Sequence, residues 1–508
     1  MKIRKNVWVL LFIIITVVVI ANKGYETFLF RPCSAHQWRQ SDGASYALNY
    51  YQNNIDFLPS QVHHRHAMDG KAMSEFPIVY YLAAQLYKIF GFHDYFIRLI
   101  HFSIFVIGLI FITKTAGLYT RNIFLRLIPA AFTITSAYLF YYAANFLPDV
   151  AALSFAMIGF YYFILFDRKK QLWYLMISFL LFTLAGLLKI SGAIIMVCAV
   201  AYLFSQLIFN RTYFKEFKFI SKIIIFLMVF ISILTLYGWV EYDKYVAEHF
   251  HFGGNLFGLL PIWEASVNDI LYILKRIKEL WLAAILAKYT WIMLLGCIIL
   301  FITQFKLQDS LLRFFTILAF TGVVLYSLLW FKTFDVHDYY MINLFCLPIL
   351  LFYTMIDIIE KKEWLRKNKF SYAFYGIFFL LFINSIYKCR AEQIYRYYGN
   401  DYNTFNKSYY KLEPYLRSIG INRNDIVVSV PDPSPNITLY LMNNIGFSEC
   451  YTGEHYNVNY FIHNAGAKYL IIGDSSYCHN PLYEKYCKPE FKVGEFEGIQ
   501  IFKAHRIY

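Results

Sequence analysis

Long runs of apolar residues recur along most of the chain, and they constrain its fold more than any other feature. Each run is about 15–22 residues long, close to what a helix needs to cross a hydrocarbon core of roughly 30 Å. The runs predict about eleven spans, at residues 7–21, 97–117, 124–142, 149–166, 172–188, 190–208, 219–240, 288–304, 311–331, 341–358 and 370–387. The first run lacks a small-residue cleavage site, so we expect a retained helix rather than a signal peptide.

The composition also favours a membrane protein. Of the 508 residues, 59% are hydrophobic and only 16% are charged, whereas a soluble domain carries about a quarter charged residues. The net charge is +14, but the basic residues cluster where membrane topology requires them, so we expect no nucleic-acid partner. Eight cysteines are scattered without a CxxC pair, which argues against structural zinc and thioredoxin chemistry.

The connections between the runs alternate in character, and this alternation predicts the topology. One set is short and basic, and it contains Lys2, Arg4, Lys5, Arg121, Arg126, Arg168, Lys169, Lys170, Arg211, Lys215, Lys218, Lys306, Arg313, Lys361, Lys362, Arg366, Lys367 and Lys369. The positive-inside rule places this set in the cytoplasm. We therefore expect a multi-pass protein of the plasma membrane, with its N-terminus in the cytoplasm and its C-terminus outside.

Two long connections then fall on the outer side, at about residues 22–96 and 241–287. The first is polar and rich in aromatic residues. In the second, apolar residues repeat at helical spacing from Asp269 to Ile285, which predicts a helix lying along the membrane surface. Together with the spans, these loops form an expected transmembrane domain over residues 1–388.

The C-terminal region, residues 389–508, is polar and is expected outside as well. The stretches "DIVVSV", "AKYLIIGD" and "GIQIFKA" have the character of strands, and residues 437–443 that of a helix. The expected fold class is therefore a polytopic α-helical membrane protein with a small extracytoplasmic α/β domain. Outside the cytoplasm, Cys478 and Cys487 either form a disulfide or remain thiols.

The segment "HQWRQSDGASY", residues 36–46, offers the first candidate site. Arg39 and Asp42 are three residues apart, so a helix would place them on one face. A guanidinium can bind phosphate oxygens in a bidentate manner, while a carboxylate can take a proton from an attacking hydroxyl. The alternative is a helix cap with a surface ion pair.

A second segment, "SEFPIVYY", brings another carboxylate into the same loop. Glu75 precedes Pro77, which suits the first turn of a helix. It either favours that helix N-terminus or joins Asp42 in a site. Between the two segments lie His63, His64, Arg65, His66, Asp69 and Lys71. Their spacing matches no firm ligand pattern, so a solvated loop is expected there rather than a metal site.

Further ionisable residues fall at the outer ends of the predicted spans: Asp149, Lys189, Glu241, Asp243, Asp335, His337 and Asp338. Such groups at membrane depth are unfavourable and usually functional. Lys189 in a tight outer turn suits a phosphate headgroup. Each residue alone could be an interfacial anchor, but their gathering on one face favours a site.

The order of four motifs carries a resemblance to a known family. "HQWRQSDGASYA", "SEFPIVYYLAAQLYKIFG", "FLPDVAALSF" and "GLLKISGA" resemble bacterial glycosyltransferases of the GT-C fold, relatives of the protein O-mannosyltransferases and the lipid A aminoarabinose transferase. The resemblance covers about residues 5–345. It implies a bacterial inner-membrane enzyme that moves a sugar from a polyprenyl-phosphate donor to an extracytoplasmic lipid, glycan or protein.

The same resemblance implies roles for individual residues. Asp42 corresponds to a first-loop general base, and Glu75 to a second acidic group that in some relatives helps to hold a divalent metal. Many relatives have a lysine where this chain has Phe76. The substrate and phosphate contacts are then expected among Arg39, Lys71, Lys189, Asp149, His337 and Tyr46.

Three other classes of protein remain as alternatives. A transporter or flippase of lipid-linked glycans would carry interrupted spans at matching positions in two halves, and no such repeat is visible. A polysaccharide ligase would differ mainly in the size of its donor. A membrane scaffold or receptor would not need acidic groups in several separate outer loops, so the residues favour an enzyme.

Overall fold

The computed structural model describes residues 5–53, 55–65, 69–210, 212–250, 258–365, 369–399, 407–450 and 457–504. The chain forms two compact units. The membrane unit comprises Met1–Phe28, Arg98–Val240 and Gly258–Tyr395, and the polar unit comprises Leu29–Ile97, Glu241–Phe257 and Arg396–Tyr508. The polar unit therefore combines parts of both long loops with the C-terminal region. The expected boundary near residue 388 stays a prediction.

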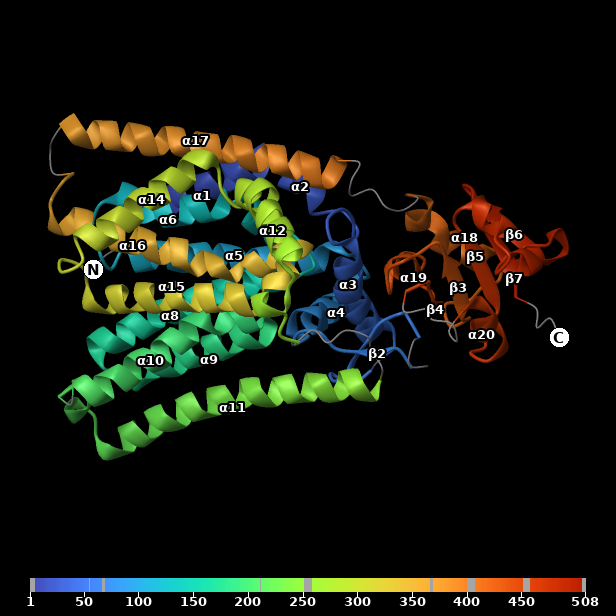
Figure 1. Cartoon of the computed structure of the whole chain (residues 1–508), viewed down its shortest axis with the longest axis horizontal. Coiled ribbons are helices and arrows are strands. Elements are labelled where there is room, and N and C mark those ends of the chain that lie inside the picture. Colours follow the sequence, from blue (N-terminus) through green and yellow to red (C-terminus); the bar gives the residue numbers. More distant parts are fainter. Residues whose placement is uncertain are drawn as a thin grey trace. The chain divides into compact units, whose positions relative to one another are not determined.

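The membrane unit is built from long helices that run side by side (Figure 1). The helices that lie wholly or largely in it are α1 (Lys5–Ala21), α2 (Gly24–Thr27), α5 (Tyr95–Ala116), α6 (Ile123–Ile134), α7 (Ala137–Ala143), α8 (Asp149–Lys169), α9 (Leu172–Leu188), α10 (Ile194–Phe209), α11 (Phe219–His249), α12 (Val267–Arg276), α13 (Leu282–Ile285), α14 (Lys288–Thr303), α15 (Ser310–Leu329), α16 (Cys346–Lys361) and α17 (Lys369–Tyr398). Short 3₁₀ segments join several of them, among them η1 (Ile190–Ala193), η2 (Tyr213–Glu216), η3 (Ile262–Glu264), η5 (Phe331–Asp335), η6 (Asp338–Met341) and η7 (Asn343–Phe345). The π-helical turn η4 (Ile277–Trp281) connects α12 to α13.

Every predicted apolar run coincides with helix, but the number of spans differs from the expectation. In the described part of the chain, 7 helices are long and apolar enough to cross a membrane, or up to 9 if each of two bent pairs counts as one span. The remaining runs correspond to α1 and α9, which have 17 residues each. At about 1.5 Å per residue, such helices fall slightly short of a hydrocarbon core of roughly 30 Å. The count of eleven is therefore not confirmed.

Burial separates central from peripheral helices in this unit. The most apolar windows of α8 and of residues 338–361 are 78% and 83% buried, whereas those of α11 and α17 are only 17% buried. Helices buried on all sides form the core, and helices with apolar exposed faces meet lipid. Asp149 begins one of these central helices, and His337 directly precedes the other central segment.

The amphipathic stretch of the second long loop is helical, as predicted. Residues 267–285 form α12, η4 and α13, and this stretch makes an angle of 93° with α14. If α14 crosses the bilayer, the stretch lies close to the membrane plane. Its exposed apolar side chains, including Val267, Leu271 and Leu274, then have lipid to contact.

The polar unit holds a five-stranded sheet in the order β4-β3-β5-β7-β6. Its elements are α3 (Gln37–Gln52), β1 (Ser60–Gln61), β2 (Lys71–Ala72), α4 (Ile78–Phe90), α18 (Leu412–Ser418), β3 (Val427–Val430), α19 (Ile437–Leu441), β4 (Gly446–Phe447), α20 (Val458–His463), β5 (Tyr469–Ile472), β6 (Lys492–Phe496) and β7 (Ile499–Lys503). Strand β3 pairs in parallel with β4 and β5, while β7 pairs antiparallel with β5 and β6. The three predicted strands and the predicted helix are all present.

The histidine segment of the first loop is part of this unit's core, not a solvated loop. His63 and His64 are 0% and 2% exposed. The backbone carbonyl of His63 accepts a hydrogen bond from Gly446 N at 3.0 Å, and Arg65 N donates to the Gly446 carbonyl at 2.7 Å. A Cβ at Gly446 would lie 1.9 Å from the Val427 carbonyl oxygen, so only glycine fits there. His66 lies outside the described residues.

Candidate active site

Helix α3 places the first candidate residues on one face and buries them. Arg39, Asp42 and Tyr46 follow at intervals of three and four residues, the spacing that aligns side chains along a helix. They are 6%, 2% and 0% exposed. Arg39 Nη1 lies 3.9 Å from Asp42 Oδ2. The arrangement is therefore a buried charge cluster, and the alternative of a surface ion pair is wrong.

Glu75 joins this cluster from the segment just before α4. Pro77 is the N-cap residue of that helix, which begins at Ile78. The Glu75 carboxylate forms an ion pair with Arg39 and accepts hydrogen bonds from Ser74 Oγ, at 2.6 Å, and from the Tyr80 hydroxyl. A Cβ at Gly43 would lie 2.7 Å from the Tyr80 ring, so the glycine after Asp42 lets Tyr80 pack against α3.

Asp42 differs from Glu75 because it has few hydrogen-bond partners. Its Oδ1 is buried and has no hydrogen-bond partner in the described part of the chain. Burial raises the pKa of Asp42 to about 7, with Glu75 and Asp432 adding to the shift while Arg39 and a hydrogen bond with Asn436 oppose it. Asp42 is thus a carboxylate that can exchange a proton near neutral pH.

Two residues of the C-terminal region also belong to this cluster, and the sequence reasoning missed both. Asn436 Nδ2 donates to the Ser41 carbonyl at 3.2 Å, and its Oδ1 accepts from His63 N at 3.1 Å. Asp432 is fully buried, and its charge acts on Asp42. Both residues stand in "VPDPSPN", directly after β3. The sequence pattern that could have indicated them is the series of polar residues between prolines at the carboxyl end of a parallel strand.

The buried His63 has a structural role. Its Nδ1 shares a hydrogen bond with Ser45 Oγ, and its Nε2 lies 3.3 Å from Asn443 Oδ1. Burial lowers the pKa of His63 to about 3, with the charge of Arg423 acting in the same direction. A neutral ring with both nitrogens engaged joins α3 to the sheet region of the polar unit.

A divalent metal does not fit at Glu75 as the residues are arranged. Both of its oxygens already accept from donors, and one of these is the Arg39 cation. No group of three histidine, cysteine or acidic side chains is placed to hold a metal among the described residues. A further buried carboxylate, Asp243, lies within electrostatic range of Glu75 and Arg39.

Lys71 does not join the cluster in the described structure. Its ammonium pairs with Asp69 at 3.1 Å and lies 4.7 Å from the centre of the Phe250 ring. The pair is about one third exposed. The expectation that Lys71 contacts phosphate therefore has no support from its surroundings.

In the membrane unit, Lys189 and Asp149 form a second cluster. Lys189 is the single extended residue between α9 and η1, and Asp149 is the first residue of α8. Lys189 Nζ lies 3.4 Å from Asp149 Oδ1 and 4.8 and 4.3 Å from the ring centres of Tyr339 and Tyr340. The Lys189 side chain is 18% exposed. This is a cation held in place at the end of two helices.

His337 belongs to the same cluster. Its ring stacks on Tyr340, with ring centres 5.8 Å apart, and lies 5.4 Å from Tyr339. The next residue, Asp338, is buried and accepts a hydrogen bond from the Tyr142 hydroxyl. The structure thus brings together Lys189, Asp149 and His337, three of the residues expected to contact substrate.

The segment that carries these aromatic residues also lines an apolar cavity of about 690 Å³. Phe331, Phe334, Met341, Leu344 and Phe345 contribute to its wall, and further residues come from α14 and α15. The cavity is wide enough for a ligand of drug size or for a length of hydrocarbon chain. One chain segment therefore borders both a fixed cation and a large apolar space.

Comparison with known proteins agrees with this architecture. Residues 74–235 match the family described as dolichyl-phosphate-mannose-protein mannosyltransferase, a range that includes Glu75, Asp149 and Lys189. The structure is similar to ArnT from Cupriavidus metallidurans in the apo state, with a TM-score of 0.59 and 11% identity over 98% of both chains. This chain has a GT-C fold. The similarity extends to ArnT bound to undecaprenyl phosphate, with a TM-score of 0.61 and 10% identity over 98% of both chains.

The family match and the structural likeness together relate this GT-C fold to those of the protein mannosyltransferases and ArnT. The predicted fold class is therefore confirmed. No curated protein matches the sequence. At 10–11% identity, the structural likeness concerns the fold and assigns no role to single residues.

Proposed function

We propose that this chain is a membrane glycosyltransferase that moves a sugar from a polyprenyl-phosphate donor to an acceptor outside the cytoplasm. The observation that carries the proposal is the buried Asp42 carboxylate, with one oxygen unengaged by described residues. The GT-C fold adds to it, because the similar ArnT was solved with undecaprenyl phosphate bound. A bacterial inner membrane is the proposed location.

Asp42 is proposed as the general base of the transfer. In this step, the acceptor hydroxyl gives its proton to Asp42, and its oxygen forms a bond to the anomeric carbon of the sugar. The bond from that carbon to the phosphate oxygen breaks, and polyprenyl phosphate leaves with the electron pair. A base with a pKa of about 7 is well matched to this task near neutral pH.

Glu75 and Arg39 are proposed to position and tune that base. The Arg39 guanidinium pairs with Glu75 and lies near Asp42. Arg39 therefore favours the charged form of Asp42, whereas the Glu75 charge opposes it. The opposing effects keep the carboxyl close to the point where it can both accept and release a proton. Tyr46 is proposed to order Ser74, since their hydroxyl oxygens lie 3.5 Å apart.

Lys189 is proposed to bind the donor phosphate. A phosphate needs a cation to balance the charge that grows as the glycosidic bond breaks. Lys189 supplies one, and Asp149 and the two tyrosine rings hold it in place. The apolar cavity lined by residues of the 331–345 segment suits the isoprenoid tail. An amphiphile with an anionic head and a long apolar chain fits this combination. His337 is proposed to contact the sugar or the phosphate.

The test is a transfer assay with the purified full-length protein. Polyprenyl-phosphate sugar labelled in the sugar is incubated with the protein and with envelope membranes as the source of acceptor. We expect release of polyprenyl phosphate with label in the acceptor, and loss of both in Asp42→Asn. Asp474→Asn, an exposed surface change in the polar unit, is the matched control. Full activity in Asp42→Asn would remove the proposed base, and label that crosses a vesicle membrane uncleaved would favour a flippase.

A further inference from the structure

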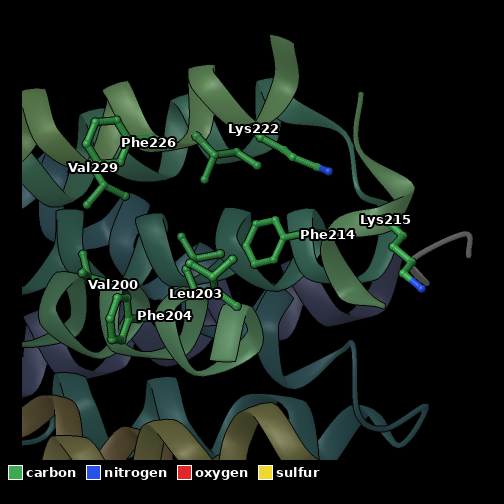
Figure 2. Close-up of a pocket in the computed structure, with 10 residues that line it drawn as sticks. Val200, Leu203, Phe204, Phe214, Lys215, Lys222, Phe226 and Val229 are labelled. Atoms are coloured by element: carbon green, nitrogen blue, oxygen red, sulfur yellow. The ribbon is translucent and has the colours of Figure 1, made fainter. Parts of the chain in front are cut away.

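A second apolar groove lies between α10 and α11, and none of the described residues that line it belongs to either cluster above. It has a volume of about 540 Å³ and is lined by Val200, Leu203, Phe204, Leu207, Phe214, Lys215, Lys222, Ile225, Phe226 and Val229. Eight of these ten residues are apolar. Figure 2 shows Lys215 and Lys222 at one end of the groove, and Val200, Phe204, Phe226 and Val229 toward the other end. The groove therefore has a cationic end and an apolar end.

The two lysines at the cationic end are exposed, and neither forms an ion pair with a carboxylate in the described part of the chain. None of the described residues that line the groove is acidic. Glu216 lies beside Lys215 in η2, but it is exposed and not part of the lining. Asp167 is engaged by Lys170 at 3.2 Å and by the Tyr213 hydroxyl at 2.8 Å. Two positive charges at the mouth are thus left for a ligand.

The apolar wall of the groove faces the surroundings of the protein rather than its core. Phe204, Leu207 and Phe226 are 62%, 55% and 67% exposed. They belong to residues 190–209, which comprise η1 and α10, and to α11, and the length and composition of both segments suit a membrane crossing. Val200 and Leu207 are seven residues apart on α10, which is about 10 Å along a helix axis. A chain in this groove would run from the lysines into the hydrocarbon region.

The sidedness follows from the sequence. Lys215 and Lys222 belong to the basic stretch between residues 211 and 222, which the positive-inside rule places at the cytoplasmic surface. Anionic phospholipids of that leaflet attract lysines close to the membrane. A phosphodiester at the lysines and an acyl chain along the apolar wall would match both ends of the groove. A zwitterionic lipid carries the same phosphodiester, but its ammonium group offsets the negative charge, so the lysines should hold it more weakly.

We propose that this groove is a binding site for an anionic phospholipid of the cytoplasmic leaflet. The phosphate is held by Lys215 and Lys222, and one acyl chain packs against α10 and α11. This inference does not depend on the proposed transferase activity. A bound lipid here would hold the poorly buried α11 against α10, since only 17% of the most apolar window of α11 is buried by protein.

The experiment measures lipid binding to the delipidated full-length protein by native mass spectrometry. Phosphatidylglycerol and phosphatidylcholine with the same acyl chains are compared. Each lysine near an anionic surface adds about a fivefold preference. We therefore expect Lys215→Gln/Lys222→Gln to weaken phosphatidylglycerol binding about 10- to 30-fold and phosphatidylcholine binding clearly less. Lys215→Arg/Lys222→Arg keeps the charge and should bind like the wild type.

Two further variants decide whether the groove itself is the site. Lys306→Gln/Lys362→Gln removes two exposed lysines on the same predicted side that do not line the groove, and it should leave binding unchanged. Val229→Trp fills the apolar end and should weaken binding of both lipids. The proposal would be overturned if Lys306→Gln/Lys362→Gln weakened phosphatidylglycerol binding as much as Lys215→Gln/Lys222→Gln does. Unchanged lipid binding in Val229→Trp would overturn it as well. If glycerol phosphate competes for the site as strongly as phosphatidylglycerol does, the site binds phosphate without needing a lipid chain. That result would also overturn the proposal.

Discussion

Arg39 on α3 and Glu75, just before α4, form an ion pair in which both side chains are buried, with exposures of 7% and 6%. The two residues are 36 positions apart, so the pair ties two elements of the first loop together. Arg39 also lies 3.9 Å from Asp42. The charge of the proposed base is therefore linked to the contact that holds α3 and the α4 segment together.

Removal of the cation from this pair should destabilise the polar unit. Arg39→Met leaves two buried carboxylates without a counter-charge, and loss of one partner of a buried pair costs about 3–5 kcal/mol. We expect a clear drop in the unfolding temperature of the purified protein in detergent. The double change Arg39→Met/Glu75→Gln should recover part of the lost unfolding temperature. Glu495→Gln breaks a half-exposed pair with Lys492 and should cost less than about 1 kcal/mol. An effect of Arg39→Met no larger than this control would contradict the buried pair.

The raised pKa of Asp42 predicts how activity depends on pH. The proposed base works only when it is ionised, so the rate constant kcat/KM should rise with pH and level off above a pKa of about 7. Glu75→Gln removes a negative charge that helps to raise the Asp42 pKa, and the midpoint should move to lower pH. A profile for the wild type that is flat from pH 5 to 8 would contradict Asp42 as the base.

The same pKa predicts a stability effect with a defined sign. Because burial raises the pKa of Asp42 from 3.8 to about 7, the folded state binds one more proton than the unfolded state between these values. The free energy of unfolding therefore falls as pH rises across this window, and the effect is constant above it. Asp42→Asn should gain unfolding temperature relative to the wild type as pH increases from 4 to about 7. A constant difference across the window would contradict the raised pKa.

The helices and strands could be predicted because each follows from local patterns. Apolar runs of spanning length predicted α5, α8, α11 and the others, and short stretches rich in Val and Ile predicted β3, β5 and β7. The spacing of Arg39 and Asp42 was sufficient to place them on one face of α3. The exact number of spans could not be predicted, because α1 and α9 fall near the minimum length and two other runs are bent.

The partners of Asp42 were harder to foresee because they come from distant segments. Asn436 lies almost four hundred residues after Asp42 and reaches the site through the turn after β3. His63 appeared as one of several polar loop residues, but its burial depends on pairing between the first loop and β4. Hydropathy cannot show such a contact, since the polar side chains are satisfied by one another rather than by water.

Lys189 should control the affinity for polyprenyl phosphate if it binds the donor's phosphate. Lys189→Met removes the cation and should weaken binding of polyprenyl phosphate at least about tenfold, or about 1.4 kcal/mol. Lys189→Arg should retain most of the affinity. Asp149→Asn should instead strengthen the binding of polyprenyl phosphate, since it removes the carboxylate 3.4 Å from the Lys189 ammonium. Lys332→Met, in η5 of the same segment, is the matched control. Weakening by the Lys332 change equal to that of Lys189→Met would indicate a general charge effect.

Reporter fusions test the orientation on which the outer location of both clusters depends. The basic residues Lys361 and Lys362 are expected in the cytoplasm, and α17 then carries the chain across the membrane once more. A phosphatase that works only outside the cytoplasm should be active when fused after Tyr508 and inactive when inserted after Lys362. A fluorescent protein that folds only in the cytoplasm should give the reverse pattern. Only α17 separates the two positions among the predicted spans. Opposite reporter signals at Lys362 and Tyr508 would therefore show that α17 crosses the membrane. Fluorescence after Tyr508 would place the polar unit's C-terminal residues in the cytoplasm, where no polyprenyl-linked transfer to an outer acceptor could involve them.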